Sequence, residues 1–248
     1  MSHLQLPTRV ARALAGFTLV AWASCGHAQQ EMIDTPVWGG AIDFGFVETS
    51  GNSEGLTMAF SLDYGRDGPR WRHALHLEAF NQTGDDERQA EYYLGYWQSN
   101  LKFNEQQSMF FRGQYDEDKF STYTSQAVIS LGYSQRVINN ESVVLDLDVG
   151  PGYRRSQLAE TDDIENELIV RFAGNLKWVI NATASFGQTL SVEQGPDNTA
   201  VRSSSSLTMN VYKALAIKLS YKLRWNRVVD PDTDPMDRET NIGVVYQW

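Results

Sequence analysis

"LAIKLSYKLRW", residues Leu215–Trp225, alternates between two kinds of side chain at every position. One face carries Leu215, Ile217, Leu219, Tyr221, Leu223 and Trp225, and the other carries Ala216, Lys218, Ser220, Lys222 and Arg224. Successive side chains of a β-strand point to opposite faces, whereas a helix repeats about every 3.6 residues. The segment is therefore predicted to be a strand with one apolar face and one mostly charged face.

The same alternation continues from Trp38 to the last residue and predicts twelve strands. The expected ranges are 38–47, 55–64, 71–81, 90–101, 108–116, 124–137, 142–153, 166–179, 183–193, 203–212, 215–228 and 239–248. Most of them reach the roughly 9–11 residues that a tilted strand needs to cross a bilayer core, whereas soluble strands average about 5–6. The expected fold class is all-β, a closed antiparallel transmembrane β-barrel of about 12 strands.

The connections between these strands fall into two alternating sets. One set is short, at 65–70, 102–107, 138–141, 180–182 and 213–214, and the other is generally longer and holds seventeen of the 31 acids. Outer-membrane barrels have short periplasmic turns and longer extracellular loops, so both termini are predicted to be periplasmic. Aromatic residues gather near the ends of the strands, which matches two interfacial girdles. They are Tyr64, Trp71, Phe103, Trp178, Tyr212 and Trp248 near the turns, and Phe46, Phe80, Tyr92, Tyr115, Tyr123, Tyr153 and Trp225 near the loops.

The first 28 residues have the layout of a secretory signal peptide. Arg9 and Arg12 precede an apolar run, and a small-residue site ends at Ala28. Cleavage is expected after Ala28, leaving a short periplasmic segment at 29–37 and a barrel domain at 38–248 in the bacterial outer membrane. Lipid attachment at Cys25 is an alternative, although Trp22 stands where such a site normally has an aliphatic residue.

The charge and cysteine content exclude several classes of protein. The chain has 31 acids and 21 bases, for a net charge of −10, which argues against a nucleic-acid partner. Removing the signal peptide takes away two arginines, so the exported chain has 19 bases against 31 acids, a charge of −12. Cleavage also removes the one cysteine, which leaves no disulfide and no cysteine-ligated metal site.

The polar faces of the strands place charged side chains inside the predicted barrel. The acids are Asp43, Asp63, Glu78, Asp146 and Asp148, and the bases are Arg171, Lys177, Lys218, Lys222 and Arg224. Because the last strand of a closed barrel pairs with the first, the basic strand 215–228 is expected one strand away from Asp43. Two arrangements are compatible with this pattern: a narrow polar pore with charge-segregated walls, or an interior plugged by salt bridges and water.

Catalysis has little support in the pattern. His73 and His76 lie three residues apart on one strand and are expected on opposite faces, His76 inward, so they cannot act as a pair. Acid pairs such as Asp85-Asp86 and Asp162-Asp163 could form a hydrolase pair or a cation site, but the run 230–237 lacks the glycine and terminal glutamate of a calcium loop. We expect a solvated acidic rim, no metal site and no cofactor.

Three segments carry a resemblance to a known family. They are "WGGAIDFGFVETSGNSEG" at 38–55, "FRGQYDEDKFSTY" at 111–123 and "VGPGYRRS" at 149–156. Their order and spacing resemble the YdiY-like salt-induced outer-membrane proteins, the family of domain of unknown function 481, over about residues 38–248. The resemblance implies an outer-membrane barrel and a name linked to salt response, with no catalytic mechanism and no functional residues. Thr124 stands where the family pattern would place an acid, which puts an ionic role at that position in doubt.

The expected function is that of an envelope component, either a narrow pore for small ions or solutes or a barrel that supports envelope integrity. The alternatives are an outer-membrane hydrolase with an acidic extracellular mouth and a non-conducting structural barrel. The expected partners are outer-membrane lipids and lipopolysaccharide, with the protein as a monomer. The final strand, with Tyr246 and Trp248 on its lipid face, resembles the signal that the barrel assembly machinery takes up.

Overall fold

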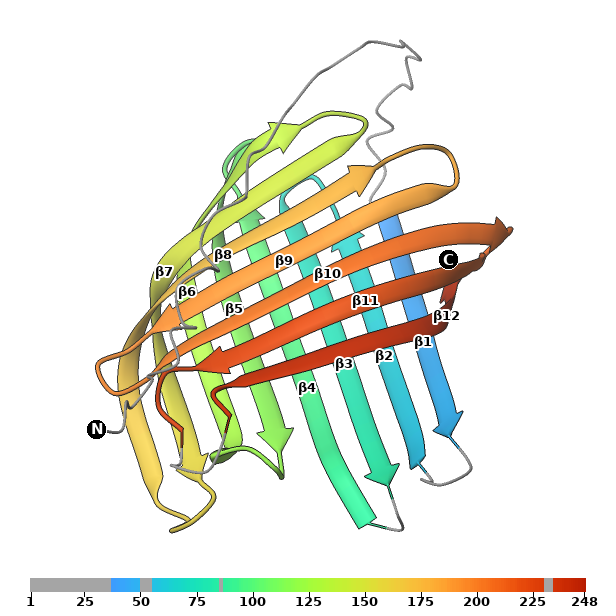
Figure 1. The fold of residues 1–248 in the computed structure, drawn as a ribbon. Helices are drawn as coiled ribbons and strands as arrows, with labels where there is room; N and C mark the ends of the chain where they lie inside the picture. The colour runs from blue at the N-terminus through green and yellow to red at the C-terminus, as the bar shows by residue number, and fades with distance from the viewer. Residues whose placement is uncertain (1–36, 50–54, 85–86, 230–233) are drawn as a thin grey trace, which may run out of the picture. The chain divides into compact units, whose positions relative to one another are not determined.

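Twelve antiparallel strands form a closed barrel in the computed structural model, which describes residues 37–49, 55–84, 87–229 and 234–248 (Figure 1). Their bounds are β1 Val37–Thr49, β2 Gly55–Asp67, β3 Trp71–Gly84, β4 Glu87–Lys102, β5 Gln107–Asp118, β6 Tyr123–Asn139, β7 Val143–Leu158, β8 Ile164–Val179, β9 Ala184–Gln194, β10 Thr199–Tyr212, β11 Leu215–Asn226 and β12 Met236–Gln247. Each strand pairs with its neighbours in the chain, and β1 pairs with β12. The predicted fold class and strand number are confirmed.

Among the described residues, no helix is long and apolar enough to span a membrane. The expected signal peptide and the lipid-attachment alternative at Cys25 fall within residues 1–36 and lie outside the described residues. The expected periplasmic segment does so as well, except for Val37, which begins β1.

The connections differ less in length than the sequence pattern predicts. At the end that carries Val37 and Trp248, here called the turn end, the five turns have two to four residues. At the opposite end, the loop end, the six connections have two to nine residues, because the hairpins continue beyond the apolar alternation. β10 begins at Thr199 rather than at 203, and β7 continues to Leu158 rather than stopping at 153. A ladder of hydrogen bonds needs paired backbone groups and not an apolar face, so the end of the alternation predicts the ends of these strands poorly.

The alternation correctly predicts which side chains face outward. In β11, Leu215, Ile217, Leu219 and Tyr221 are exposed, whereas Ala216 and Ser220 between them are buried. Phe44 and Phe46 on β1 are exposed in the same way, on either side of the buried Gly45. A continuous apolar outer surface on a barrel with a polar interior is typical of strands that face lipid.

The aromatic residues at the turn end form contacts on the outer surface, as expected of a girdle. Trp71, His73 and Trp97 stack in sequence, with ring centroids 5.9 Å and 6.2 Å apart. At the loop end the expectation is partly wrong, because Tyr92 and Tyr123 are buried, and Phe80 lies on the inward face of β3, two residues from Glu78. Phe80 and Tyr92 face inward by the regular alternation, on the same faces as Glu78 and Tyr96, whereas the β-bulge at Tyr123/Ser125 exchanges the two faces of β6 locally.

The barrel closes at a short seam between β1 and β12. The register contains five pairs, from Ala41↔Gln247 to Gly45↔Gly243. Gly40 and Trp248 extend the seam by exchanging two backbone hydrogen bonds of 3.1 Å each. The Trp248 ring covers Gly40 so closely that a Cβ there would come within 2.3 Å of it, and the ring stacks against Tyr246. Trp248 is therefore anchored by its backbone and by its ring.

Replacing Trp248 with alanine is expected to destabilise the barrel by about 1–2 kcal/mol, because the ring packs on Gly40 and Tyr246 at the seam. The measurement is denaturant unfolding of the barrel in lipid vesicles. Trp178→Ala is the matched control, since Trp178 is an exposed ring near the turn end with no ring contact in the structure. Equal losses in the two variants would show that the seam contact adds nothing.

β6 and β7 approach each other closely in the middle of the wall, where Gly132 and Gly150 have no side chains. A Cβ added to Gly132 would lie 2.2 Å from the carbonyl oxygen of Val149, and one added to Gly150 would lie 2.1 Å from that of Leu131. Both contacts are with backbone, which cannot move aside as a flexible side chain can. These positions therefore require glycine for the two strands to stay paired.

Candidate functional site

The interior of the barrel is the candidate site, because the described residues place most of their buried polar and charged side chains there. At the seam, Lys218 on β11 donates to Asp43 on β1 over 3.2 Å. The two residues lie on strands separated only by β12, as the closed topology predicts. Asp43 is 6 % exposed, so this ion pair is shielded from solvent.

A second group lies on β2 and β3 around His76. Its Nδ1 lies 2.7 Å from Asp63 and its Nε2 lies 3.3 Å from Glu78, so each ring nitrogen is within hydrogen-bond distance of a carboxylate. Lys222 donates to Glu78 over 2.6 Å and to Glu239 over 3.3 Å. This chain of contacts joins β3 to β11 across the interior.

A third group, which we call the arginine cluster, contains Arg154 and Glu193, the two least exposed charged residues described. Its members are Arg112, Arg154, Arg171 and Arg202, together with the acids Asp116, Glu167 and Glu193. They lie on β5, β7, β8, β9 and β10, toward the loop end. Glu193 stands at the centre, since all four arginines act on it electrostatically. Arg171 donates to it over 3.0 Å and Arg202 over 3.4 Å.

Arg154 is the most enclosed member of the arginine cluster, with a side chain that is 0 % exposed. Its guanidinium binds Glu167 through two nitrogens, Nε over 2.9 Å and Nη2 more closely. Nη2 also donates to the backbone carbonyl of Asn198 over 2.7 Å, which ties β7 to the loop between β9 and β10. Glu167 in turn accepts backbone N–H groups of Asp197 and Asn198, so the loop is held over the cluster.

Several ion pairs join strands on opposite sides of the barrel. Arg202 on β10 donates to Asp116 on β5 over 3.2 Å, and these strands are five positions apart in the ring. Arg224 on β11 reaches Asp118 on β5 over 3.8 Å, six positions away, while its guanidinium lies 3.9 Å from the centroid of the Tyr92 ring. These cross-interior contacts close the barrel toward its loop end.

A second set of contacts lies near the turn end. Arg72 donates to Asp67 over 3.1 Å and to Asp146 over 3.4 Å. Arg136 binds Asp146 over 2.8 Å and 3.0 Å, and Lys102 also binds Asp67. Strands β2, β3, β4, β6 and β7 are thereby linked through two carboxylates.

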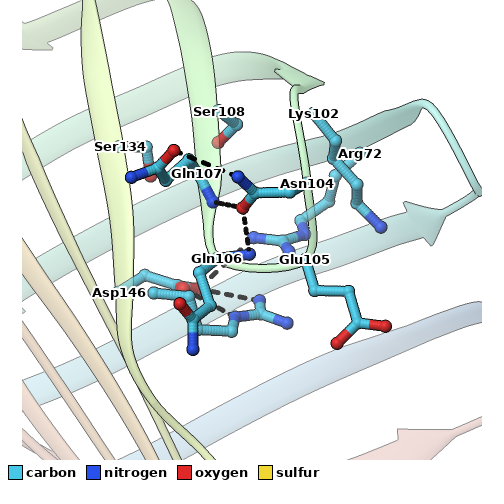
Figure 2. Close-up of a pocket in the computed structure, with 10 residues that line it drawn as sticks. Arg72, Lys102, Asn104, Glu105, Gln106, Gln107, Ser108, Ser134 and Asp146 are labelled. Carbon is cyan, nitrogen blue, oxygen red and sulfur yellow. Dashed lines mark hydrogen bonds and ion pairs between the residues drawn. The ribbon is translucent and has the colours of Figure 1, made fainter.

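The turn between β4 and β5 packs beside this second set (Figure 2). The Asn104 side chain accepts the backbone N–H groups of Gln106 and Gln107 over 2.9 Å and 2.8 Å, which is the local hydrogen bonding that favours asparagine in turns. The hollow between this turn, Arg72 and Asp146 has no volume that water could enter. At the loop end, the cavity lined by Tyr92, Arg202 and Arg224 has about 20 Å³, room for about one water molecule.

The charged residues predicted from the sequence do not form one acidic wall and one basic wall. Arg171, Lys218 and Lys222 each pair with an acid, and Asp146 pairs with Arg72 and Arg136. Asp148 accepts a hydrogen bond from Gln98 over 3.2 Å. Lys177 is exposed near the turn end and is the one predicted residue without a hydrogen bond or ion pair in the described structure. The second expected arrangement, an interior filled with ion pairs, describes the loop half.

The sequence reading missed most of the arginine cluster. Asp116 is the last residue of the predicted strand 108–116, and Arg202 falls just before the predicted strand 203–212, because both strands continue past the apolar alternation. Arg154 lay just outside the predicted strand that ended at 153. Extending each alternation by four residues would have placed these side chains inward. The partners of each charge, however, depend on how the strands meet across the interior.

The hydrolase alternative gains no support from the geometry. With Asp63 and Glu78 on its two ring nitrogens, His76 has no free nitrogen with which to activate a hydroxyl. Asp162 and Asp163 lie in a described loop, whereas Asp85-Asp86 and residues 230–233 lie outside the described residues. Within the described part of the chain, no group of three or more His, Cys, Asp or Glu side chains could hold a metal ion.

The model of the family described as "Protein of unknown function, DUF481" matches residues 42–248. The chain belongs to the DUF481 family. A DUF481-type relative, the "Uncharacterized protein YdiY" of Escherichia coli (strain K12), is 23 % identical over 209 residues, which cover 84 % of this chain and 82 % of that protein.

Solved barrels resemble this DUF481 protein in fold. The NanC porin superposes with a TM-score of 0.52 at 10 % identity, over 84 % of this chain and 98 % of that one. The COG4313 outer membrane channel from Pseudomonas putida F1 gives a TM-score of 0.49 at 8 % identity, over 91 % of this chain and 100 % of that one. The superposition on the NanC porin shows that the DUF481 chain has the fold of an outer-membrane β-barrel.

Proposed function

We propose that the protein is a narrow outer-membrane pore for small ions or solutes, held closed by the ion pairs that cross its interior. The observation that carries the proposal is the set of contacts between opposite strands, above all Arg202 with Asp116 and Arg224 with Asp118. Such contacts close the path through the barrel, and breaking them requires only side-chain movement. The wall itself need not change.

The energetics of buried ion pairs support a passage rather than a plain structural barrel. Removing two charges from water costs several kcal/mol per ion, and replacing such pairs by apolar residues is often neutral or stabilising. A barrel selected only for rigidity would gain as much from an apolar interior. An interior that retains Arg154, Arg171, Arg202 and Glu193 preserves a polar path instead.

Exposure inside the barrel changes from one end to the other. Toward the turn end, the Asp63 side chain is 48 % exposed and Lys177 is exposed. Toward the loop end, Arg154 and Glu193 are 0 % and 1 % exposed. The least exposed charges thus support a constriction at the arginine cluster.

The test is planar-bilayer conductance of the folded barrel. The double variant Arg202→Ser/Asp116→Ser removes one cross-interior pair without leaving either charge unpaired, and Glu193 keeps Arg171. We expect rare, small openings in the unaltered protein and at least about tenfold more open time in the variant, which corresponds to roughly 1.4 kcal/mol. The matched control is Arg88→Ser/Glu91→Ser, which removes an ion pair at the loop end that lies outside the arginine cluster.

Silence from both folded proteins would contradict the pore and leave the non-conducting structural barrel. Equal conductance changes in the control would show that loss of any ion pair perturbs the barrel. Hydrolysis of lipid or peptide that is abolished by His76→Ala would support the hydrolase alternative instead.

The proposed location is the bacterial outer membrane, with export by a signal peptide cleaved after Ala28 and with both termini in the periplasm. This is supported by the porin-like fold and the apolar outer surface.

The proposed partners are outer-membrane lipids and lipopolysaccharide, with the barrel as a monomer. Lys119 and Arg88, which bind Glu91 at the loop end, could contact lipopolysaccharide phosphates, and hydrogen bonding to Glu91 raises the pKa of Lys119. The proposed assembly signal is the anchored strand end with Tyr246 and Trp248.

A further inference from the structure

Four hydrogen-bond donors of the described interior are buried without an acceptor, and they come from consecutive strands. They are Arg112 Nε on β5, Ser130 Oγ on β6, Arg154 Nη1 on β7 and Arg171 Nε on β8. Arg154 Nη1 lies 3.9 Å from a Glu193 oxygen, within reach of an ion pair but beyond hydrogen-bond distance. The four residues are 9 %, 2 %, 0 % and 5 % exposed. Burying a donor without an acceptor is unfavourable, and more so when the donor is charged. Four such donors on neighbouring strands indicate a shared acceptor.

Arg112 differs from the other arginines of the described interior because no carboxylate pairs with it. Its guanidinium donates to the side-chain oxygens of Gln98 and Gln114 and lies 3.6 Å from the centroid of the Tyr96 ring. All of these partners are neutral. The charged groups that act on it without contact are Arg171, a cation, and the Glu193 carboxylate. A buried charge in this position is unfavourable unless an anion compensates it.

The register brings the donors to one region of the wall. Arg112 lies directly opposite Ser130, and directly opposed side chains on one face of an antiparallel pair lie about 5 Å apart at Cβ. Ser130 in turn lies opposite Gly152, while Arg171 lies opposite Gly150. Both glycines lack side chains, so β6 and β8 pack closely on β7 here: Ser130 Cβ and Ile169 Cγ1 each lie 3.1 Å from where a Cβ of Gly152 would be.

The charges of the arginine cluster leave a positive excess. Arg112, Arg154, Arg171 and Arg202 supply four positive charges, and Asp116, Glu167 and Glu193 supply three negative ones, a difference of one. Glu193 already accepts from Arg171 and Arg202, and Glu167 from Arg154 and two backbone groups. One further negative charge would balance the cluster and accept the free donors.

We propose that Arg112, Ser130, Arg154 and Arg171 form a binding site for one small monovalent inorganic anion inside the barrel wall. Guanidinium N–H groups form strong charge-assisted hydrogen bonds with anions, and the serine hydroxyl adds a neutral donor. The anion would link four strands and stabilise the folded barrel by binding it in preference to the unfolded chain. The site requires no conduction, so it stands or falls separately from the pore.

The test measures the stability of the purified, folded full-length barrel in detergent as bromide replaces gluconate at constant sodium concentration. The readout is the midpoint temperature at which the compact gel band converts to the unfolded band. Binding should raise this midpoint with saturation, by about 3–6 °C at ten times the dissociation constant. A steady change without saturation is a general salt effect or hydration by water, and it would overturn the proposal.

Variants locate the effect. Arg112→Gln should abolish the saturable shift, and it leaves no acid unpaired because the natural partners of Arg112 are neutral. Ser130→Ala should raise the half-saturating bromide concentration at least about threefold, since one hydrogen bond is lost. Arg136→Gln is the control and should keep the full shift, because Arg136 binds Asp146 near the turn end.

An unchanged shift in Arg112→Gln would overturn the site. If that variant gave no folded band, Ser130→Ala would decide, because alanine at this partnerless position removes one hydroxyl and little volume. An unchanged half-saturating concentration in Ser130→Ala would then place bromide elsewhere. A conductance of zero in all these proteins would contradict the pore and leave the anion site in place.

Discussion

Arg154→Leu is expected to lower the free energy of unfolding by about 3–5 kcal/mol, the loss typical of removing one partner of a buried ion pair. Arg154 is fully enclosed and supplies the ion pair of Glu167, and its loss leaves that carboxylate buried without a cation. The substitution also releases the carbonyl of Asn198, so the loop between β9 and β10 loses its tie to β7. Denaturant unfolding of the barrel in lipid vesicles measures the difference.

Arg155→Leu is the matched control, since Arg155 is the next residue on β7 and is exposed on the outer side. It should change the unfolding free energy by less than about 0.5 kcal/mol. A restoring experiment is Arg154→Leu/Glu167→Leu, in which both charges are absent. Recovery of stability in this double variant identifies the unpaired carboxylate as the cause, whereas an equal loss would assign it to packing.

Gly150→Ala is expected to destabilise the barrel by about 3 kcal/mol or more, enough to reduce the yield of folded protein. The added methyl group would lie 2.1 Å from the carbonyl oxygen of Leu131 and 2.7 Å from the Cα of Gly132. Since both contacts are with backbone, β6 and β7 must separate, and the hydrogen bonds beside this point weaken. The fraction of heat-modifiable compact protein after refolding measures the effect.

Gly113→Ala provides the comparison, because a Cβ at Gly113 meets no atom within 4 Å. Both substitutions change glycine to alanine in a strand, so they share the same gain in strand propensity and differ only in the space available. Folding that is equally impaired in both would contradict the role of the close approach between β6 and β7.

The wall of the barrel follows from local chemistry and was predictable from the sequence. The alternation in Leu215–Trp225 depends only on which side of a strand meets lipid, and each strand shows an apolar alternation of its own. The position of the basic strand one strand away from Asp43 also followed, since closure fixes which strands meet, whereas the ion pair of Lys218 with Asp43 is seen only in the structure. The matched family and the confirmed strand number agree with this reading.

The interior was predictable only in part, because its contacts depend on tilt and on distances across the barrel. Arg202 and Asp116 are separated by 86 residues, and no local pattern shows that they meet. Tyr123 lies inside beside a register shift, which its residue type does not indicate, while Tyr92 lies inside on the same face of β4 as Tyr96. The absence of a carboxylate at Arg112 likewise appears only when the strands are assembled.

The chain connects eleven of the twelve neighbouring strand pairs of this barrel, whereas β1 and β12 are joined at the seam by hydrogen bonds and not by a loop. Its two described ends lie on paired strands, about 5 Å apart laterally, so a short peptide could connect them. Joining Trp248 to Val37 and cutting one of the connections at the loop end would produce a circular permutant with the same twelve pairings. The strand pair that no loop connects would then lie elsewhere in the ring, while the ion pairs of the interior would stay where they are.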